Sequence, residues 1–344
     1  MNSGENIVLT GAGGCIGSAL AHRLAKSDAE RLILLDRSEH ELYEINLALG
    51  AVEGGAPHTA IVGDVCDAAL LAEAFEEHRP TTIYHAAAFK HVPMMERNPF
   101  AAIRNNVFGT LGLARAAHKY KAAQLVMVST DKAVNPWSVM GVSKRIAELI
   151  LLRWDSASTR MKAVRLGNVL GSRGSVVPLF MKQIARGGPV TVTHPDVSRH
   201  FVSLSEAVDI ICAAGDQQNG GMFVAKVGEP VKIADLARQL IHDGGFDPAK
   251  QLPVVFTELR PGEKLDEEMV FANETVEATG DERIRHVRCP QLDTARFDAD
   301  IAELQESVER RDLSASLEML VRIVPEYEPS KLLLSQVARS CAPQ

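Results

Sequence analysis

Asp131 and Lys132 are adjacent side chains of opposite acid–base character, and they follow a hydrophobic stretch at residues 124–129. The composition of that stretch predicts a buried strand. A carboxyl group can protonate a departing oxygen, and a lysine with a depressed pKa can remove a proton from carbon. Such pairs are commonly surface ion pairs, but ligands bind at strand ends in open α/β sheets. The position therefore favours a catalytic pair.

Three glycines, Gly11, Gly14 and Gly17, span the junction of a predicted strand at residues 6–10 and a predicted helix at residues 15–26. The first glycine permits a tight turn, the second lets backbone approach a pyrophosphate, and the third lets the helix pack against the sheet. The helix N-terminus then faces the anion. We expect a dinucleotide here; the alternative is an ordinary strand-to-helix turn.

Asp36 ends the next predicted strand, where its carboxylate would accept hydrogen bonds from both ribose hydroxyls of a dinucleotide. Asp64 follows the third predicted strand and would meet the adenine amine. NAD is favoured because a carboxylate repels the 2′-phosphate of NADP, although Arg37 is available to that phosphate if it is not a solvated charge. The expected cofactor contacts are Gly11, Gly14, Cys15, Ile16, Gly17, Asp36, Arg37, Asp64, Val65, Ala86, Ala87 and Lys144.

The elements that would position these residues alternate between short hydrophobic runs and amphipathic stretches, the pattern of a parallel α/β sheet. We predict a Rossmann-type doubly wound sheet with a smaller mixed α/β substrate domain. The strands are expected at residues 6–10, 31–36, 59–63, 82–86, 124–129 and 163–167, and helices at 15–26, 101–120 and 139–152. The domains are expected at residues 1–170 (NAD binding), 171–325 (substrate, interleaved with the first) and 326–344 (extension).

Composition narrows the class of protein further. The chain has 344 residues and a formal net charge of −7, which argues against a nucleic-acid-binding face. Its five cysteines, Cys15, Cys66, Cys212, Cys289 and Cys341, lack metal-site or disulfide-framework spacing. No apolar run is long enough to span a bilayer and the first strand begins at once, so we expect a cytoplasmic chain with reduced thiols and no metal site.

The residues around the acid–base pair resemble those of the extended short-chain dehydrogenase/reductase family. In that family a Ser or Thr at a strand end is followed by Tyr-x-x-x-Lys on a helix, and the lysine holds the nicotinamide ribose and lowers the phenol pKa. Here Ser129 ends the strand and Lys144 matches the lysine, but Met140 stands at the tyrosine position. Because a thioether cannot exchange a proton at neutral pH, the usual base is missing.

Four further motifs, at residues 84–96, 104–110, 165–178 and 259–264, are similar to one branch of that family. They resemble the polysaccharide-biosynthesis 4,6-dehydratases that act on UDP-N-acetylglucosamine, whose large membrane-attached members carry methionine for tyrosine. The resemblance covers about residues 5–290. It implies dehydration of that sugar to a UDP-4-keto-6-deoxy sugar for surface polysaccharide or glycan synthesis, and a homo-oligomer. The chain would be soluble itself, or the cytoplasmic part of a membrane-anchored parent.

The resemblance also implies roles for individual residues. Asp131 would protonate the C6 hydroxyl and Lys132 would remove the C5 proton, while the C4 proton would leave through Thr130, Asp131 or a water. Arg199 and Arg260 would bind the diphosphate, Glu263 the uridine ribose, and Asn168 a phosphate or the sugar. The expected substrate contacts are Lys90, His91, Asn168, Ser175, Val176, Arg199, Arg260 and Glu263.

Two alternatives remain open on the sequence. A UDP-sugar epimerase needs no acid aimed at C6 and usually keeps its tyrosine, so Asp131 and Met140 discriminate against it. A catalytically silent NAD-binding module would account for Met140, but not for the retained Asp131, Lys132 and Lys144.

Overall fold

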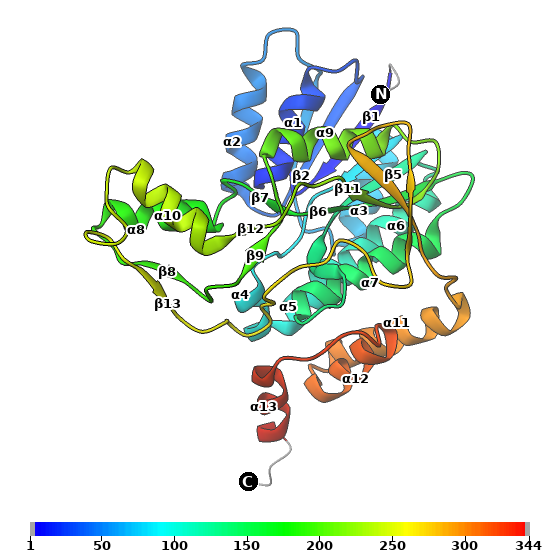
Figure 1. Ribbon diagram of the computed structural model, residues 1–344. Coiled ribbons are helices and arrows are strands. Elements are labelled where there is room, and N and C mark those ends of the chain that lie inside the picture. Colours follow the sequence, from blue (N-terminus) through cyan, green and yellow to red (C-terminus); the bar gives the residue numbers. More distant parts are fainter. Residues whose placement is uncertain (1–3, 341–344) are drawn as a thin grey trace.

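The computed structural model describes residues 4–340 and contains a nine-stranded sheet at its centre (Figure 1). Seven neighbouring strands are parallel, and the last two pair antiparallel. The spatial order begins with the 3-2-1-4-5-6 arrangement of dinucleotide-binding Rossmann folds. In that order the strands are β3 (His58–Val62), β2 (Arg31–Asp36), β1 (Asn6–Thr10), β4 (Thr82–His85), β5 (Gln124–Thr130), β6 (Arg160–Leu166), β11 (Gly221–Ala225), β15 (Ile284–Arg288) and β14 (Thr275–Ala278).

Helices cover both faces of this sheet, which explains why its central strands are hydrophobic along their whole length. One face is covered by α1 (Cys15–Ala25), α2 (Glu39–Gly50) and α9 (Leu204–Gly215). The other is covered by α3 (Ala68–His78), α6 (Gly109–Lys119) and α7 (Val139–Trp154). The Rossmann-type fold expected from the sequence is therefore confirmed.

The helix expected at residues 101–120 is divided into three segments. These are α5 (Pro99–Ile103), a π-helical turn η1 (Arg104–Phe108) and α6. Asn106 lies in the π turn and bonds both backbone groups of Phe89 and the hydroxyl of Ser143. π turns are frequent at functional sites, and this one ties α7 to the loop after β4.

A smaller lobe has its own hydrophobic core and lies to one side of the sheet in Figure 1. It is built from α8 (Val176–Ala185), β8 (Val190–Val192), α10 (Ile233–Asp243) and β13 (Val254–Phe256). Two short ladders lead to it, β7 (Asn168–Val169) with β10 (Phe201–Val202), and β9 (Ser198–Arg199) with β12 (Val231–Lys232). Because β11, β14, β15 and α9 return to the large sheet, the chain passes between the two parts more than once. The division at residues 170 and 325 stays a prediction.

Three helices follow the last strand: α11 (Thr294–Glu309), α12 (Leu313–Ile323) and α13 (Lys331–Ser340). Leu304, Leu320 and Leu333 are fully buried in the core beneath α6 and α7. No helix between residues 4 and 340 combines the length and apolarity needed to cross a membrane. Cys15, Cys66, Cys212 and Cys289 are free thiols, and Cys341 lies outside the described residues.

Candidate active site

The turn after β1 requires glycine at two of the three predicted positions. Gly11 has a φ of +69°, and a Cβ there would lie 2.5 Å from the backbone nitrogen of Ala87. A Cβ on Gly17 would lie 1.9 Å from the carbonyl oxygen of Gly11, so only glycine lets α1 begin this close to the strand. The predicted positions Ala86 and Ala87 thus form the wall against which the turn packs.

Gly14 is the N-cap of α1 and supplies no side-chain hydrogen bond to the first turn. The helix begins with Cys15 and then Ile16. Because no side chain caps its first N–H groups, they are available to an anion. A fourth glycine was missed in the sequence. A Cβ on Gly13 would lie 2.5 Å from the Cβ of Glu41, so this residue lets α2 approach the turn. The run Gly11-Ala12-Gly13-Gly14 contained the signal.

Asp36 is nearly buried at the end of β2 and supports the same turn. Its Oδ2 accepts from the backbone N–H of Gly13 at 2.9 Å, and its Oδ1 from that of Ser38 at 3.0 Å. A carboxylate has about four acceptor sites, so two stay open for ribose hydroxyls. The guanidinium of Arg37 lies 4.1 Å from the centroid of the Phe89 ring.

Asp64 and Val65 lie at the entrance to α3, after β3. The Oδ1 of Asp64 accepts from the backbone N–H of Cys66 at 2.9 Å. Val65 is buried and packs on Gly109, where a Cβ would lie 2.8 Å from its Cγ2. Both predicted residues therefore sit at the carboxyl edge of the sheet, with Asp64 able to accept and Val65 providing an apolar wall.

A buried hydrogen-bonded chain runs beneath the cofactor turn from β1 to α6. His85 lies between the hydroxyls of Thr10 (2.7 Å from Nδ1) and Thr110 (3.0 Å from Nε2). The hydroxyl of Thr110 donates its proton to the carbonyl of Asn106. That hydroxyl must therefore accept from the Nε2–H of His85, and the Nδ1 of His85 accepts from the hydroxyl of Thr10. Burial, together with the smaller effect of the Lys144 charge, lowers the pKa of His85 to about 3. This histidine is thus a neutral structural link.

The predicted acid–base residues form a connected group immediately after β5. Lys132 Nζ donates to Asp131 Oδ1 at 2.9 Å and to Asn168 Oδ1 at 2.8 Å. Thr130 also donates to Asp131 Oδ1, at 2.8 Å. Asp131 is fully buried, and its Oδ2 has no hydrogen-bond partner among residues 4–340. One oxygen is therefore available to a ligand, while the other is held by two donors.

Glu267 is an additional acidic group at this site that the sequence analysis missed. Its Oε1 lies 3.7 Å from Lys132 Nζ, and its side chain is 4% exposed. Burial raises its pKa, while Lys132 opposes the rise and Asp131 adds to it. It follows the predicted Arg260-to-Lys264 motif by three residues, but no local pattern indicates that this part of the chain returns to the end of β5.

The N-terminus of α7 packs tightly against the loop after β5, which carries Asp131 and Lys132. A Cβ on Gly141 would lie 2.3 Å from the carbonyl oxygen of Lys132, so glycine permits this contact. The Oε1 of buried Glu96 accepts from the N–H of Val139 at 2.7 Å, which satisfies an orphan donor of the helix. Met140 is 3% exposed and belongs to the hydrophobic core.

Lys144 lies one turn further along α7 and is also buried. Burial lowers its pKa to about 8, with Glu148 acting in the opposite direction. Its Nζ makes no hydrogen bond to another residue in the part of the chain that the structure describes. An ammonium group has three donors, so Lys144 is free to bind a ligand hydroxyl.

Beneath the site, two arginines and two glutamates form a buried ion-pair cluster, here called the β6 cluster: Arg145, Glu148, Arg165 and Glu274. Ser129 at the end of β5 donates to Glu148 Oε1 at 2.7 Å. The cluster therefore connects β5, α7, β6 and the loop that follows Glu267. No local sequence pattern indicates this cluster.

The predicted substrate residues fall into two groups. Lys90 and His91 lie before α4 (Val92–Arg97), and His91 meets Gly174, whose Cβ would lie 2.6 Å from the imidazole Cε1. Ser175 is the N-cap of α8, makes no capping hydrogen bond, and has a buried Oγ without a partner within residues 4–340. Val176 begins α8. Asn168, the remaining member of this group, accepts a hydrogen bond from Lys132 Nζ at 2.8 Å.

The second group, Arg199, Arg260 and Glu263, is engaged within the protein. Arg199 is buried and donates to the carbonyls of Ser198, Lys264 and Leu265, so its guanidinium organises this loop. Arg260 is exposed and forms an ion pair with Glu263, with Nη2 2.6 Å from Oε1. A diphosphate would have to compete with that carboxylate for Arg260.

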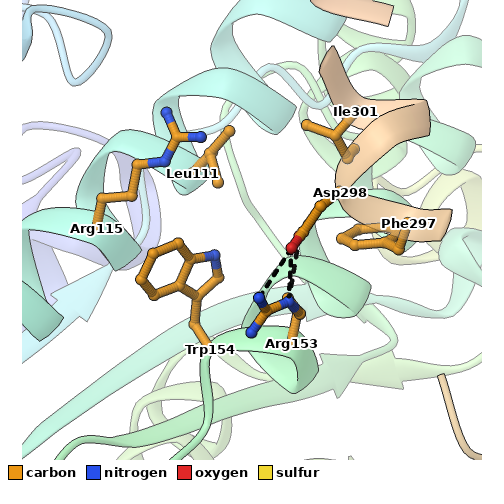
Figure 2. A pocket seen from close by; sticks show the side chains of 7 residues that line it. All are labelled: Leu111, Arg115, Arg153, Trp154, Phe297, Asp298 and Ile301. Carbon is orange, nitrogen blue, oxygen red and sulfur yellow. Dashed lines mark hydrogen bonds and ion pairs between the residues drawn. The ribbon is translucent and has the colours of Figure 1, made fainter. Parts of the chain in front are cut away.

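One cavity lies away from all of these residues. It measures about 310 Å³ and is bounded by α6, the last turn of α7 and α11. Figure 2 shows Arg153 bridging to Asp298 beside Trp154 and Phe297. Arg153 lies nine residues beyond Lys144 on α7, or about 13 Å at 1.5 Å per residue. Among residues 4–340 no group of His, Cys, Asp or Glu is arranged to hold a metal ion.

The sheet order and the arrangement of Ser129 and Lys144 identify the class: the protein is an extended short-chain dehydrogenase/reductase. A family model described as polysaccharide biosynthesis protein matches residues 7–289. The chain belongs to this family.

Two relatives illustrate the similarity. The capsular polysaccharide biosynthesis protein CapD of Staphylococcus aureus is 46% identical over 274 residues, which are 78% of this chain and 46% of that protein. The chain thus spans about half the length of that relative. A UDP-glucose 4-epimerase of Rickettsia rickettsii is 32% identical over 283 residues and covers 80% of each chain.

Solved structures show the same fold. Pen from Bacillus thuringiensis superposes with a TM-score of 0.75 at 26% identity, covering 85% of this chain and 90% of that one. DesIV from Streptomyces venezuelae, a dTDP-glucose 4,6-dehydratase, superposes with a TM-score of 0.67 at 22% identity, covering 77% and 88%. The chain is thus related to nucleotide-sugar-modifying enzymes.

Proposed function

We propose that this chain catalyses the NAD-dependent 4,6-dehydration of UDP-N-acetylglucosamine to a UDP-4-keto-6-deoxy sugar for a surface polysaccharide or glycan. The observation that carries the proposal is the pair of Asp131 and Lys132 after β5, with one carboxylate oxygen unpartnered. A redox-only reaction at C4 has no use for an additional acid and base. A dehydration needs both.

The residues of the first two strands suit NAD. The steric requirement for glycine at positions 11 and 17 and the uncapped start of α1 suit a pyrophosphate. Asp36 has acceptor sites left for the ribose hydroxyls and would repel a 2′-phosphate. When bound, the nicotinamide would accept a hydride from C4 of the sugar and return it to C6.

The protein's own groups would move the protons. Asp131 would donate to the departing C6 hydroxyl through its unpartnered Oδ2, and Lys132 would remove the C5 proton and later return it. Lys144 would hold the nicotinamide ribose through its free ammonium donors. Met140 closes this part of the site without exchanging a proton, so the C4 proton would leave through Thr130, Asp131 or a water.

Proton NMR of UDP-N-acetylglucosamine incubated with the protein in deuterated water tests the proposal. Dehydration gives a new C6 methyl signal and deuterium at C5, and the coupling constants give the C5 stereochemistry. Recovery of unchanged substrate would reject the proposal.

A UDP-sugar epimerase is the second candidate, and the similarity to the Rickettsia protein favours it. An epimerase returns hydride to C4 and loses no water. The same spectrum therefore distinguishes the two, because epimerisation changes the sugar ring couplings and produces no methyl signal.

The assembly and location are also proposals. We propose a homo-oligomer, dimer or higher, that acts in the cytoplasm on a UDP-sugar and binds no nucleic acid. The chain aligns with 46% of the length of CapD, and we propose a membrane-anchored parent protein on the resemblance of the sequence motifs alone.

A further inference from the structure

Glu267 has the least satisfied carboxylate in the proposed active site. Its Oε1 lies 3.7 Å from Lys132 Nζ and 3.8 Å from Arg199 Nη2, both longer than a hydrogen bond. Its Oε2 is buried and has no hydrogen-bond partner among the described residues, 4–340. An ionised carboxylate in such a place is costly unless it is paired. The arrangement therefore favours a carboxyl group that binds a proton.

Lys132 is the nearest source of that proton. An ammonium group has three donors, and two of them are used by Asp131 and Asn168. The remaining gap between Lys132 Nζ and Glu267 Oε1 exceeds a normal N–H···O distance by about 0.8 Å. A small rotation of either side chain would close it.

We propose that Glu267 takes the ammonium proton of Lys132 and thereby leaves the neutral amine that removes the C5 proton. This inference rests on the proposed dehydration. Glu267 is a positioning residue in this scheme, because it acts through Lys132.

The protons and bonds balance as follows. An N–H bond of Lys132 breaks and an O–H bond forms on Glu267. The amine then takes the C5 proton, the C–H electrons form the C5–C6 double bond, and the C6–O bond breaks as Asp131 supplies a proton to the leaving water. When hydride reaches C6, Lys132 returns its proton to C5 and is again a neutral amine, and Glu267 keeps its own proton for the next cycle. The carboxylate left on Asp131 regains a proton equal to the one released by the C4 hydroxyl, directly or through Thr130 or a water, so no proton is gained or lost over the cycle.

The charges around Glu267 come from three segments of chain. Lys132 and Asp131 face it from the loop after β5, Arg199 from β9, and Lys264 from its own loop. Burial raises the pKa of Glu267 above its ordinary value, Asp131 adds to the rise, and the three cations oppose it. A neutral amine beside a neutral carboxyl avoids the desolvation cost of two buried charges.

The first test compares the pH dependence of kcat/KM on UDP-N-acetylglucosamine for wild type and three variants. Glu267→Gln cannot accept the proton, so we expect at least a tenfold loss near neutral pH that becomes smaller as pH rises and Lys132 deprotonates directly. Glu267→Asp should retain the wild-type profile with a smaller loss. Glu268→Gln, an exposed neighbour that keeps an acceptor for Asn135, should behave as wild type.

A loss in Glu267→Gln that is equal at every pH would show a structural role and overturn the inference. Unchanged turnover in that variant would overturn it too.

The second test does not depend on activity. The transfer leaves the number of protons bound to the pair unchanged, so it is detected on the carboxyl group itself and not in the pH dependence of stability. In the infrared difference spectrum between wild type and Glu267→Gln near neutral pH, we expect the C=O stretch of a protonated carboxyl group. The matched difference for the exposed Glu268, measured with Glu268→Gln, should lack this band. If wild type leaves the sugar unchanged yet the band is present, only the proposed function fails. A difference that contains carboxylate bands alone rejects a proton on Glu267.

Discussion

Replacing Arg165 tests how the buried β6 cluster supports the site. This side chain is fully buried and donates twice to Glu148, twice to Glu274 and once to the carbonyl of Met269. The cluster is neutral, with two arginines and two glutamates. Arg165→Met nearly conserves length but leaves two carboxylates facing one remaining guanidinium, that of Arg145.

Breaking a buried pair by removing one partner costs about 3–5 kcal/mol, because it leaves an uncompensated charge. We expect about 4 kcal/mol for Arg165→Met, a large part of the roughly 5–15 kcal/mol that a domain possesses. Glu274→Gln in the same chain restores neutrality and should recover about half of the loss. Burial raises the pKa of Glu148, but Arg165 and Arg145 lower it further than burial raises it.

The direction in which stability changes with pH follows from this net decrease in the pKa of Glu148. Glu148 contributes stability above its unfolded pKa, and this contribution is lost as pH falls through the folded pKa. Arg165→Met removes most of it, so the difference from wild type should be largest near neutral pH and shrink below about pH 4.

Urea unfolding followed by circular dichroism measures the effect. The matched control is Arg153→Met, the same substitution in the more exposed Arg153–Asp298 pair of Figure 2, which should cost at most about 1 kcal/mol. If Arg165→Met costs no more than this control, or if Glu274→Gln restores nothing, the account of the cluster is wrong.

Three further variants test the candidate site. Gly17→Ala should abolish copurification of a dinucleotide, because the Cβ of the alanine would lie 1.9 Å from the carbonyl oxygen of Gly11. Mass spectrometry of the denatured supernatant measures the dinucleotide. Gly50→Ala is the control, because its Cβ would have no atom within 4 Å. Met140→Leu should keep most turnover, since volume and apolarity are nearly conserved, and a loss of about a thousandfold would reveal a role for the thioether. Lys132→Met should bind the UDP-sugar and accumulate reduced cofactor, seen by absorbance, while releasing product about 10²–10⁴-fold more slowly; normal turnover would contradict its role as base.

The local hydrophobic pattern of the sequence was sufficient to predict the first two strands of the fold. The strand at Asn6–Thr10 and that at Arg31–Asp36 were predicted to the residue, because hydrophobic runs bounded by turn residues are unambiguous there. The start of β6 was predicted three residues late, since Lys162 interrupts the apolar run. Its ammonium is buried and bonds the carbonyls of Gly215 and Gln217, which a local pattern does not reveal.

The parts of the site that were missed depend on long-range contacts. Glu267 reaches Lys132 from a loop 135 positions away, and Arg165 reaches Glu274 across 109. The hydrophobic periodicity of these segments does not indicate such long-range contacts. The π turn was missed for a similar reason, because Asn106 is held by the backbone of Phe89 rather than by its own helix.

The antiparallel pair at the end of the sheet has a consequence for solubility. Without β15 and β14, the buried strand β11 would present its unpaired backbone groups at an edge, where another chain could add a strand. The two added strands move that edge outward by about 10 Å. The new edge, β14, has four exposed residues, and its Glu277 pairs with Arg288. A short, charged edge resists further strand addition, so this end of the sheet is protected against growth into intermolecular β-structure.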